Sequence, residues 1–507
     1  MKTLFFLILF FAGFPAYTHA METNVDVALG DGSCLGMVIE KVAQLNSTYK
    51  VMTTGAVFRI EENEMHIYQG LSTVREISSV HWTEPDSFKL IVQNMDHVVF
   101  QGRGLTVAIY GDSTCVIRPD HAVKLKIHGV FKPEYIGRYQ GELLMIDQHG
   151  GIDICSDRNR KDYPIEFLSD THKVWKATYD LEKDERLMLA AFPARSFDWE
   201  KSYATNIVFT QAAQGGHYGQ MPPEWLIRKW SQYFNIMVLW HNGLYIDQDK
   251  KTTYAGPYEI ANPAELLRAI GIAHLVGFKV ALYTSFYYFQ QKHKSVEAYF
   301  REIKHLKDVY QIDGVYIDGL LTETSGHQND QVFTNWEIIR RLRALFGADG
   351  VIVYHGTAYG HSAATMPQVD TYCDATLNGE NVPFTSYNDP YIQYQVRKYG
   401  ISNTVALWKP GPGPYKENER SMIDAVLNMH GRIRYWAGVT AVEPTAKHPQ
   451  IWQSDIDENY RYYLRRLLSE KQARSGKRST DHKEAVVGHT AAGDHSTDRV
   501  VPVDGMP

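Results

Sequence analysis

Two hydrophobic patterns divide the chain. Up to about residue 180, short apolar runs are separated by turn signals such as residues 102–104 and 149–151. Residues 123–127 alternate strictly between aliphatic side chains and lysines. Such alternation is typical of antiparallel strands with one exposed face. The pattern predicts an all-β sandwich domain over residues 21–180.

From residue 181 the apolar runs become continuous and alternate with amphipathic helices. A continuous run indicates a strand buried on both faces, as in a parallel sheet covered by helices. Eight such strands predict an α/β TIM barrel, (β/α)8, over residues 181–468. The expected strands are residues 187–192, 236–240, 280–284, 314–317, 351–354, 371–377, 404–407 and 438–442.

Two of the intervening helices have clear sequence signals. Asn262 precedes Pro263, and Glu265 completes a capping box, so the helix is expected to begin at Pro263 and to end at Gly277. A second helix is expected over residues 422–433, with apolar side chains on one face.

The two ends of the sequence differ from the rest. Residues 1–20 carry Lys2, a short apolar run and a small-residue exit, which predicts a secretory signal peptide and a secreted or periplasmic protein. That run is too short to span a bilayer, and no later stretch is long enough. Residues 469–507 are polar, so we expect a disordered tail.

The composition limits which kinds of molecule the protein is expected to bind. The net charge is −6 and no strong basic block is present, which argues against nucleic acid. The four cysteines, Cys34, Cys115, Cys155 and Cys373, have no zinc-like spacing. Disulfides among the first three and free buried thiols are both open. We predict no cofactor and no bound metal, and the sequence leaves the oligomeric state undetermined.

Asp318 is the strongest candidate for chemistry. It ends the apolar run 314–317 and is followed by Gly319. In a parallel barrel the carboxyl ends of all strands face one rim, where catalytic groups gather. A carboxylate that ends a buried strand costs several kcal/mol if it is unpaired, so chance placement is disfavoured. Glu380, which follows the expected sixth strand, offers a second carboxylate on the same rim.

Other rim residues are candidates for substrate binding, because sugars are bound by aromatic faces and by hydrogen-bonding side chains. Each has a structural alternative as well, namely core packing for the aromatic residues and a satisfied hydrogen bond for the polar ones. The candidates are Trp240, His241, Tyr287, His355, Asp374, Asn378, Trp408 and Lys409.

A metal site is the alternative use of the histidines. His241, His355 and His361 would have to converge with Asp318 on a divalent ion. No His-x-His motif ends the first expected strand, so hydrogen bonding to substrate is the preferred interpretation.

The segment from Gly314 to Gly319 resembles the fourth-strand motif of clan D α-galactosidase-type enzymes, which are retaining (β/α)8 glycoside hydrolases. The run from Asp370 to Glu380 is more similar to exported hydrolases near glycoside hydrolase family 123. The likeness covers residues 180–445. In clan D, Asp318 would hold the place of the nucleophile and Glu380 would fall near the acid/base. Two features depart from these families: Tyr316 replaces the clan D lysine, and Gly319 replaces the second acid of the family 123 Asp-Glu pair.

The predicted function is an exported glycoside hydrolase that cleaves oligo- or polysaccharides with two carboxylates, Asp318 and Glu380, by a retaining mechanism. A non-catalytic carbohydrate-binding barrel and a metal-dependent barrel hydrolase are the alternatives.

Overall fold

A computed structural model describes most of the chain. The described residues are 23–25, 39–70, 74–83, 87–94, 96–139, 142–158, 165–168, 172–195, 198–214, 217–246, 253–320, 330–355, 367–378, 403–407, 419–428, 431–437 and 455–491. They form two compact units that interleave along the sequence. The first unit comprises residues 1–197, 283–376 and 398–403, and the second comprises residues 198–282, 377–397 and 404–507.

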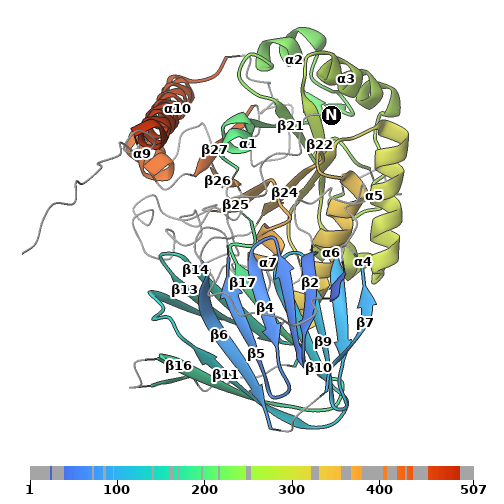
Figure 1. Cartoon of the computed structure of the whole chain (residues 1–507). Helices are drawn as coiled ribbons and strands as arrows, with labels where there is room; N and C mark the ends of the chain where they lie inside the picture. The colour runs from blue at the N-terminus through green and yellow to red at the C-terminus, as the bar shows by residue number, and fades with distance from the viewer. Residues whose placement is uncertain are drawn as a thin grey trace, which may run out of the picture. The chain divides into compact units, whose positions relative to one another are not determined.

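The first unit contains an antiparallel β-sandwich (Figure 1). Its larger sheet has the order β1 (Thr23–Val25), β2 (Ile39–Leu45), β3 (Thr48–Thr53), β4 (Ala56–Ile60), β5 (Glu64–Gln69), β6 (Arg75–Trp82), β11 (Val123–Gly129), β16 (Trp175–Leu181) and β15 (Ile165–Phe167). The second sheet has the order β12 (Tyr135–Tyr139), β13 (Glu142–Asp147), β14 (Gly150–Ser156), β17 (Leu187–Phe192), β10 (Thr114–Pro119), β9 (Leu105–Tyr110), β8 (His97–Gln101) and β7 (Lys89–Gln93). The all-β sandwich predicted for the N-terminal part of the chain is confirmed.

The strands of the sandwich differ in how many faces they bury. In β11 the aliphatic side chains enter the core and the lysines stay out of it, as the alternation predicted. In β13, β14 and β17, by contrast, every residue is buried. Leu143 and Ile154 belong to the core between the sheets, so their neighbours Glu142 and Asp153 occupy the other face.

This double burial explains one wrong prediction. Residues 187–192 were expected as the first strand of the parallel barrel, but they form β17, which pairs antiparallel with β10 and β14. A strand with two buried faces has a continuous apolar sequence whether its neighbours are parallel or antiparallel. The sandwich therefore extends past residue 180 to Phe192.

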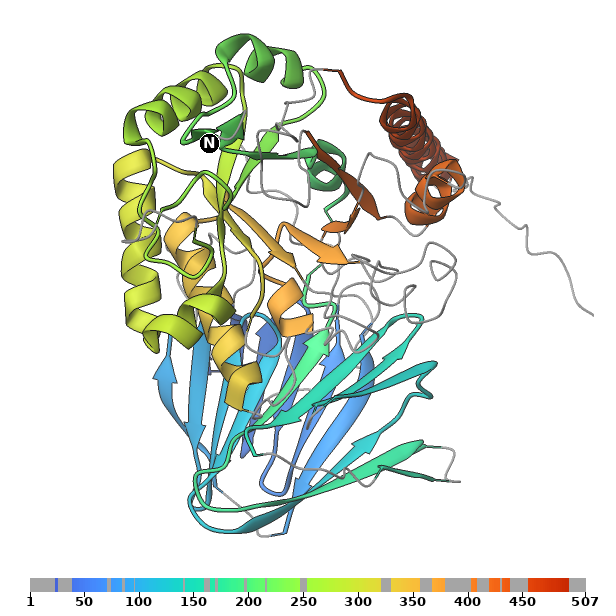
Figure 2. The same ribbon diagram turned by 180° about the vertical axis from the view of Figure 1, so that it is seen from behind.

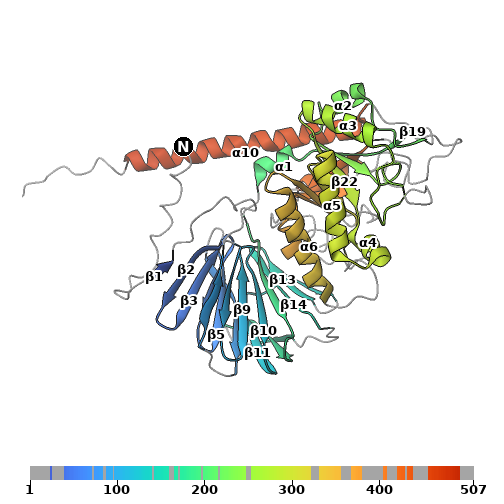
Figure 3. The same ribbon diagram turned by 90° about the vertical axis from the view of Figure 1, so that its right-hand side faces the viewer.

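The first unit also contains α/β elements. The last two residues of β22 (Lys279–Thr284) are followed by α4 (Phe286–His293), α5 (Val296–Tyr310), β23 (Gly314–Ile317), α6 (Asp330–Phe346), β24 (Val351–His355), α7 (Pro367–Asp370) and the start of β25 (Ala375–Asn378). β23 and β24 are parallel. Helices α5 and α6 run side by side, joined by a two-pronged contact of Arg341 with Glu297 (Figure 3).

The second unit is α/β as well. Its elements are α1 (Trp199–Ala204), β18 (Ile207–Gln211), β19 (Ala213–Gln214), β20 (His217–Tyr218), α2 (Glu224–Trp230), β21 (Ile236–Trp240), α3 (Pro263–Leu275), the start of β22, β26 (Asn403–Leu407), α9 (Glu419–Asn428), β27 (Arg432–Trp436) and α10 (Glu458–Ala491). Parallel pairing joins β18 to both β21 and β27, β21 to β22, and β26 to β27. The predicted α/β architecture of this part of the chain is confirmed.

The predicted parallel strands vary in accuracy. Strands β21 and β23 have the predicted bounds. Strand β18 was not predicted, and the last strand lies at Arg432–Trp436, not at residues 438–442, which are outside the described residues. Helix α9 correspondingly ends at Asn428, and Ile433 belongs to β27. Two arginines in the short run of β27 made it look like the polar end of a helix.

Helix α3 begins where the capping signal placed it. The side chain of Asn262 accepts a hydrogen bond from the backbone N–H of Glu265 at 3.3 Å, and Pro263 occupies the first turn. Gly277 follows the helix with φ of 83°, a left-handed conformation that favours glycine. The predicted start and stop of this helix are confirmed.

The predicted disordered tail is wrong for its first part, because α10 continues to Ala491. The helix packs by its tyrosines: Tyr460 and Tyr463 are buried, and Tyr460 lies 4.8 Å from the ring of Tyr435. Further along, Glu470 accepts a hydrogen bond from the hydroxyl of Tyr203 at 3.0 Å. None of the helices among the described residues combines the length and the apolar character needed to cross a membrane.

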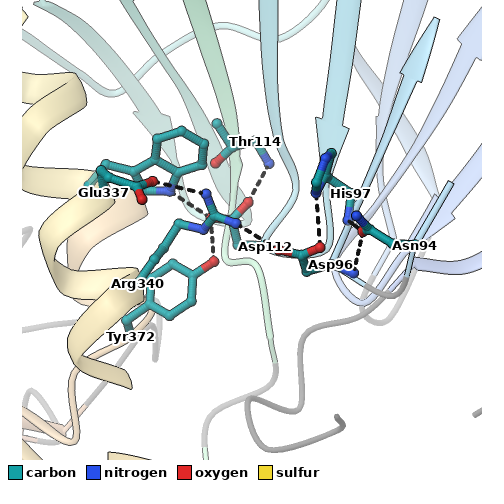
Figure 4. Close-up of polar contacts among 9 residues, drawn as sticks. Asn94, Asp96, His97, Asp112, Thr114, Glu337, Arg340 and Tyr372 are labelled. Atoms are coloured by element: carbon teal, nitrogen blue, oxygen red, sulfur yellow. Dashed lines mark hydrogen bonds and ion pairs between the residues drawn. The ribbon is translucent and has the colours of Figure 1, made fainter. Parts of the chain in front are cut away.

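A buried carboxylate ties a sandwich turn to α6 within the first unit (Figure 4). One oxygen of Asp112, Oδ2, accepts hydrogen bonds from Trp336 Nε1 and from the Tyr372 hydroxyl, each at 2.7 Å. The other oxygen accepts the backbone N–H of Thr114 at 3.1 Å. Burial and the nearby Asp112 carboxylate raise the pKa of Tyr372, which keeps it a neutral donor.

Asp112→Ala should therefore destabilise the protein. The change leaves two buried donors without an acceptor, and each hydrogen bond to a charged group contributes about 1.5–3 kcal/mol. We expect a loss of about 3 kcal/mol or more in the free energy of unfolding, measured by urea titration. Asp180→Ala is the matched control, because the Asp180 side chain is 73% exposed. Equal stability of the two variants would contradict this role of Asp112.

Candidate functional site

Asp318 lies directly after β23, at the carboxyl end of a strand whose four residues are all buried. Its backbone N–H donates to the carbonyl oxygen of Thr284 at 2.7 Å, which fixes it beside the end of β22. Gly319 has φ of 93°, so the chain turns away from the strand in a conformation that favours glycine. The backbone thus holds Asp318 where two parallel strands end.

Two aromatic side chains hold the Asp318 carboxylate. The hydroxyl of Tyr283 donates to Oδ2 at 2.7 Å, and Nδ1 of His355 lies 2.9 Å from Oδ1. Because an ionised carboxylate only accepts hydrogen bonds, His355 Nδ1 carries the proton in this contact. Tyr283 is the second-last residue of β22, and His355 is the last residue of β24.

The surroundings of the carboxylate are aromatic and partly open. The His355 ring stacks on Tyr316 at 6.5 Å with an interplanar angle of 27°. The backbone N–H of Tyr287 donates to the carbonyl oxygen of Gly319 at 3.3 Å, which places the start of α4 next to the same turn. The Asp318 side chain is 23% exposed and that of His355 is 14% exposed.

This arrangement defines what Asp318 can do. Each carboxylate oxygen has a second lone pair beyond the one used by Tyr283 or by His355. The two donors fix the orientation of the carboxylate, while its partial exposure leaves it reachable from solvent. A fixed, accessible carboxylate can attack an electrophilic carbon or stabilise a positive charge next to it.

Of the predicted site residues, the structure brings Asp318 and His355 into contact and places the backbone of Tyr287 beside the same turn, while their roles stay predictions. The sequence interpretation did not predict Tyr283, because only residues after each strand were considered as rim candidates. The alternation of β22 carries the missing signal. Thr284 directs its hydroxyl to Tyr299 of α5 at 3.0 Å, so its neighbour Tyr283 must face the opposite side.

Asp374 is placed differently from the expected substrate-binding residue. Its side chain is 3% exposed. Its Oδ2 accepts hydrogen bonds from Arg343 and from the backbone N–H of Ile352, both at 2.7 Å. Arg343 is itself buried and also donates to the carbonyl oxygen of Tyr372. This environment favours a structural role for Asp374 at the start of β25.

Trp240 and His241 lie in the second unit, at the end of β21. The Trp240 ring is 5.1 Å from that of Trp436, and the His241 ring is 5.5 Å from that of Tyr254. Both aromatic contacts are packing contacts, and a substrate-binding role for Trp240 and His241 stays a prediction.

The remaining predicted residues lie at or beyond the limits of the described part of the chain. Asn378 ends β25, and its side chain is outside the described part of the structure. Glu380, Trp408 and Lys409 lie outside the described residues, as do His361 and Glu443. Their roles stay predictions.

The described residues contain no group of three or more His, Cys, Asp or Glu side chains arranged to hold a metal ion. Cys115, Cys155 and Cys373 are free and buried, which answers the question of disulfides for these three. Burial raises the pKa of each thiol, so none of them is a ready nucleophile.

Comparisons with known proteins give no family. No family model matches the chain, and no curated protein matches it. Solved structures match weakly. An alpha-amylase from Lactobacillus plantarum has 10% identity and a TM-score of 0.37 over 54% of this chain and 81% of its own. The cycloalternan-forming enzyme from Listeria monocytogenes has 8% identity and a TM-score of 0.37 over 81% and 52%.

A GH31 dextranase from Flavobacterium johnsoniae has 9% identity and a TM-score of 0.36 over 84% of this chain and 66% of its own. Similarities at this level carry no argument about activity, so the proposals below are based on the residues of this chain.

The structural role of Asp374 is testable. Asp374→Ala leaves the buried guanidinium of Arg343 without its counter-ion, so the free energy of unfolding should fall by about 3–5 kcal/mol in urea titrations. Asp308→Ala removes an exposed ion pair with Lys304 and should change stability by less than about 1 kcal/mol. An Asp374→Ala protein of wild-type stability would contradict the structural role.

Proposed function

We propose that the chain is a glycoside hydrolase acting on oligo- or polysaccharides, with Asp318 as its central catalytic carboxylate. The observation that carries the proposal is the geometry of Asp318: it ends a buried parallel strand, both its oxygens are held by neighbouring side chains, and it is partly exposed. The order of the eight parallel strands, β18-β21-β22-β23-β24-β25-β26-β27, supports the (β/α)8 barrel as the scaffold.

In the proposed reaction, Asp318 attacks the anomeric carbon or stabilises its developing positive charge. Tyr283 and His355 keep the carboxylate oriented during this step. Glu380 then protonates the leaving oxygen. A retaining mechanism requires the two carboxyl groups to lie about 5–5.5 Å apart, whereas inversion requires about 6.5–9.5 Å. The retaining form is the one that the clan D resemblance implies.

The proposal also covers substrate binding and export. We assign substrate binding to the aromatic and polar residues that follow the strands: Trp240, His241, Tyr287, His355, Asn378, Trp408 and Lys409. Export through the segment 1–20 is also part of the proposal, and it would bring the enzyme to extracellular or periplasmic glycans.

The decisive variant is Asp318→Asn, assayed on a panel of aryl glycosides and natural glycans. The amide keeps the shape of the side chain but cannot act as a nucleophile, so kcat should fall by about a hundredfold or more. Asp308→Asn on the exposed face of α5 is the matched control and should retain wild-type kcat. Full activity of Asp318→Asn on a substrate that the wild type cleaves would overturn the assignment.

Tyr283→Phe tests how the carboxylate is held. Losing one hydrogen bond to a charged group costs about 1.5–3 kcal/mol, which corresponds to roughly a 10- to 150-fold lower kcat. KM should change little, because Tyr283 contacts Asp318 and is 1% exposed. A loss of kcat without a matching rise in KM separates this positioning role from a role in substrate binding. An unchanged kcat would exclude it.

The non-catalytic alternative makes a different prediction on the same panel. A carbohydrate-binding protein would bind glycans without cleaving any of them, and calorimetric titration of Asp318→Asn would give wild-type affinity. For a metal-dependent hydrolase, activity would disappear on dialysis against a chelator and would return with added metal.

A further inference from the structure

A pair of buried acids lies beneath helix α7, away from Asp318. Glu142 on β13 is 3% exposed and Asp153 on β14 is 1% exposed. In the antiparallel register, Leu144 faces Asp153 and Glu142 faces Cys155, so the two acids are diagonal neighbours on one face of the sheet. All of these residues belong to the first unit.

Helix α7 covers this face. Its buried residue Gln368 lies close to the Asp153 carboxyl, and Asp370 is near enough to act electrostatically on Glu142. By geometry, both oxygens of Asp153 and Oε1 of Glu142 are buried without a hydrogen-bond partner among the described residues. Figure 2 shows the short helix at the end of the sandwich beside β17. The polar groups of α7 therefore lie next to the acid pair.

The charge balance of the pair is unusual. The described residues that shift the pKa of Glu142 are both acidic, Asp153 and Asp370. On the sheet side, the neighbouring Cys155 is also close to Asp157 and Arg186. On the side of α7, Cys373 is close to Asp370, Asp374, Arg343 and Arg195. Arg186 is engaged by Asp157, with Nε donating to Oδ2 at 2.8 Å.

Two unpaired carboxylates in this environment would be very costly. A carboxyl group that keeps its proton can donate to the other, which satisfies both groups without a cation. We propose that Glu142 and Asp153 are held protonated in the native protein, so that the contact between α7 and the sheet is sensitive to pH and loosens as the pH rises.

The direction of the effect follows from the pKa values. Burial, as the largest cause, raises the pKa of Asp153 to about 7, and burial together with the Asp153 charge raises the pKa of Glu142 well above its ordinary value. The native state thus binds more protons than the unfolded chain above about pH 4. The contribution of the pair to stability is complete below the unfolded values and is lost as the pH rises through about 7 and beyond.

The protonation state of the pair is expected to affect the segment that follows α7 and leads towards the proposed site. Helix α7 is followed along the chain by Asp374 and then by β25, which ends at Asn378. Protonation of Glu142 and Asp153 would therefore stabilise the segment that leads to Asn378. The inference about the pair itself does not depend on the proposed glycosidase activity.

The experiment compares the wild type with the double variant Glu142→Gln/Asp153→Asn, which keeps the shapes but removes both ionisations. The Tm of the wild type should fall by several degrees between about pH 5 and pH 8, and the double variant should show a clearly smaller fall and exceed the wild type at the higher pH. Asp180→Asn, an exposed change, should follow the wild type. Equal pH dependence in the wild type and the double variant would overturn the proposal.

Two measurements on the wild type keep the test decisive if the double variant does not fold. Infrared spectroscopy near pH 6 should show the band of a protonated carboxyl that Asp153→Asn or Glu142→Gln removes. Amide hydrogen exchange of residues 367–374, corrected for the intrinsic rate, should accelerate at pH 8 more than that of α5. Absence of the band would contradict the proposal that the pair is protonated. A Tm that falls on addition of a chelator would show that a cation, and not a proton, neutralises the pair.

Discussion

Strands β13, β14 and β17 of the second sheet are buried on both faces, and much of the first unit depends on this constraint. One face packs against the larger sheet, and the other is covered by helical segments from later in the sequence. Neither face of such a strand is exposed to solvent, so every polar side chain on it needs a hydrogen-bond or charge partner inside the protein. The partners chosen for these polar groups distinguish structural acids from the candidate catalytic one.

Five acids of the first unit illustrate four different environments. Asp374 pairs with the guanidinium of Arg343, whereas Asp112 accepts hydrogen bonds from the neutral donors Trp336 and Tyr372. Glu142 and Asp153 are diagonal neighbours on one face of the sheet, and burial is the main cause that raises the pKa of both. Asp318 alone in this comparison combines oriented donors with partial exposure. A buried acid whose carboxylate is fully paired is expected to have a structural role. An acid that is held in one orientation and is also accessible to solvent is a candidate for catalysis.

Much of this could be predicted from the sequence, and the failures have physical causes. Strand β23 and its terminal acid were predicted because a short apolar run that ends in Asp-Gly has few other interpretations. Strand β17 was misassigned because burial on two faces removes the alternation that distinguishes antiparallel strands. Strand β27 was displaced because its fully buried Arg432 and Arg434 were taken for surface residues.

The candidate site was predictable only in part for a similar reason. Sequence position shows which residues follow a strand, but it does not show which side chain reaches back to hold another. Tyr283 is a residue of the strand itself, and it contacts Asp318 across 35 positions of sequence. The acid pair was invisible for the same reason, since Glu142 and Asp153 look like ordinary polar positions of an alternating sandwich until helix α7 covers them.

The segment from α7 to β25 links these observations. It contacts the sheet through Gln368, anchors Arg343 through Asp374, and continues into the strand that ends at Asn378. Its two anchors respond differently to pH: the ion pair of Asp374 needs its charge, whereas the contact of Gln368 adjoins acids that favour their protons. The segment is therefore held best where Asp374 is ionised and the buried pair is protonated, which is a mildly acidic range.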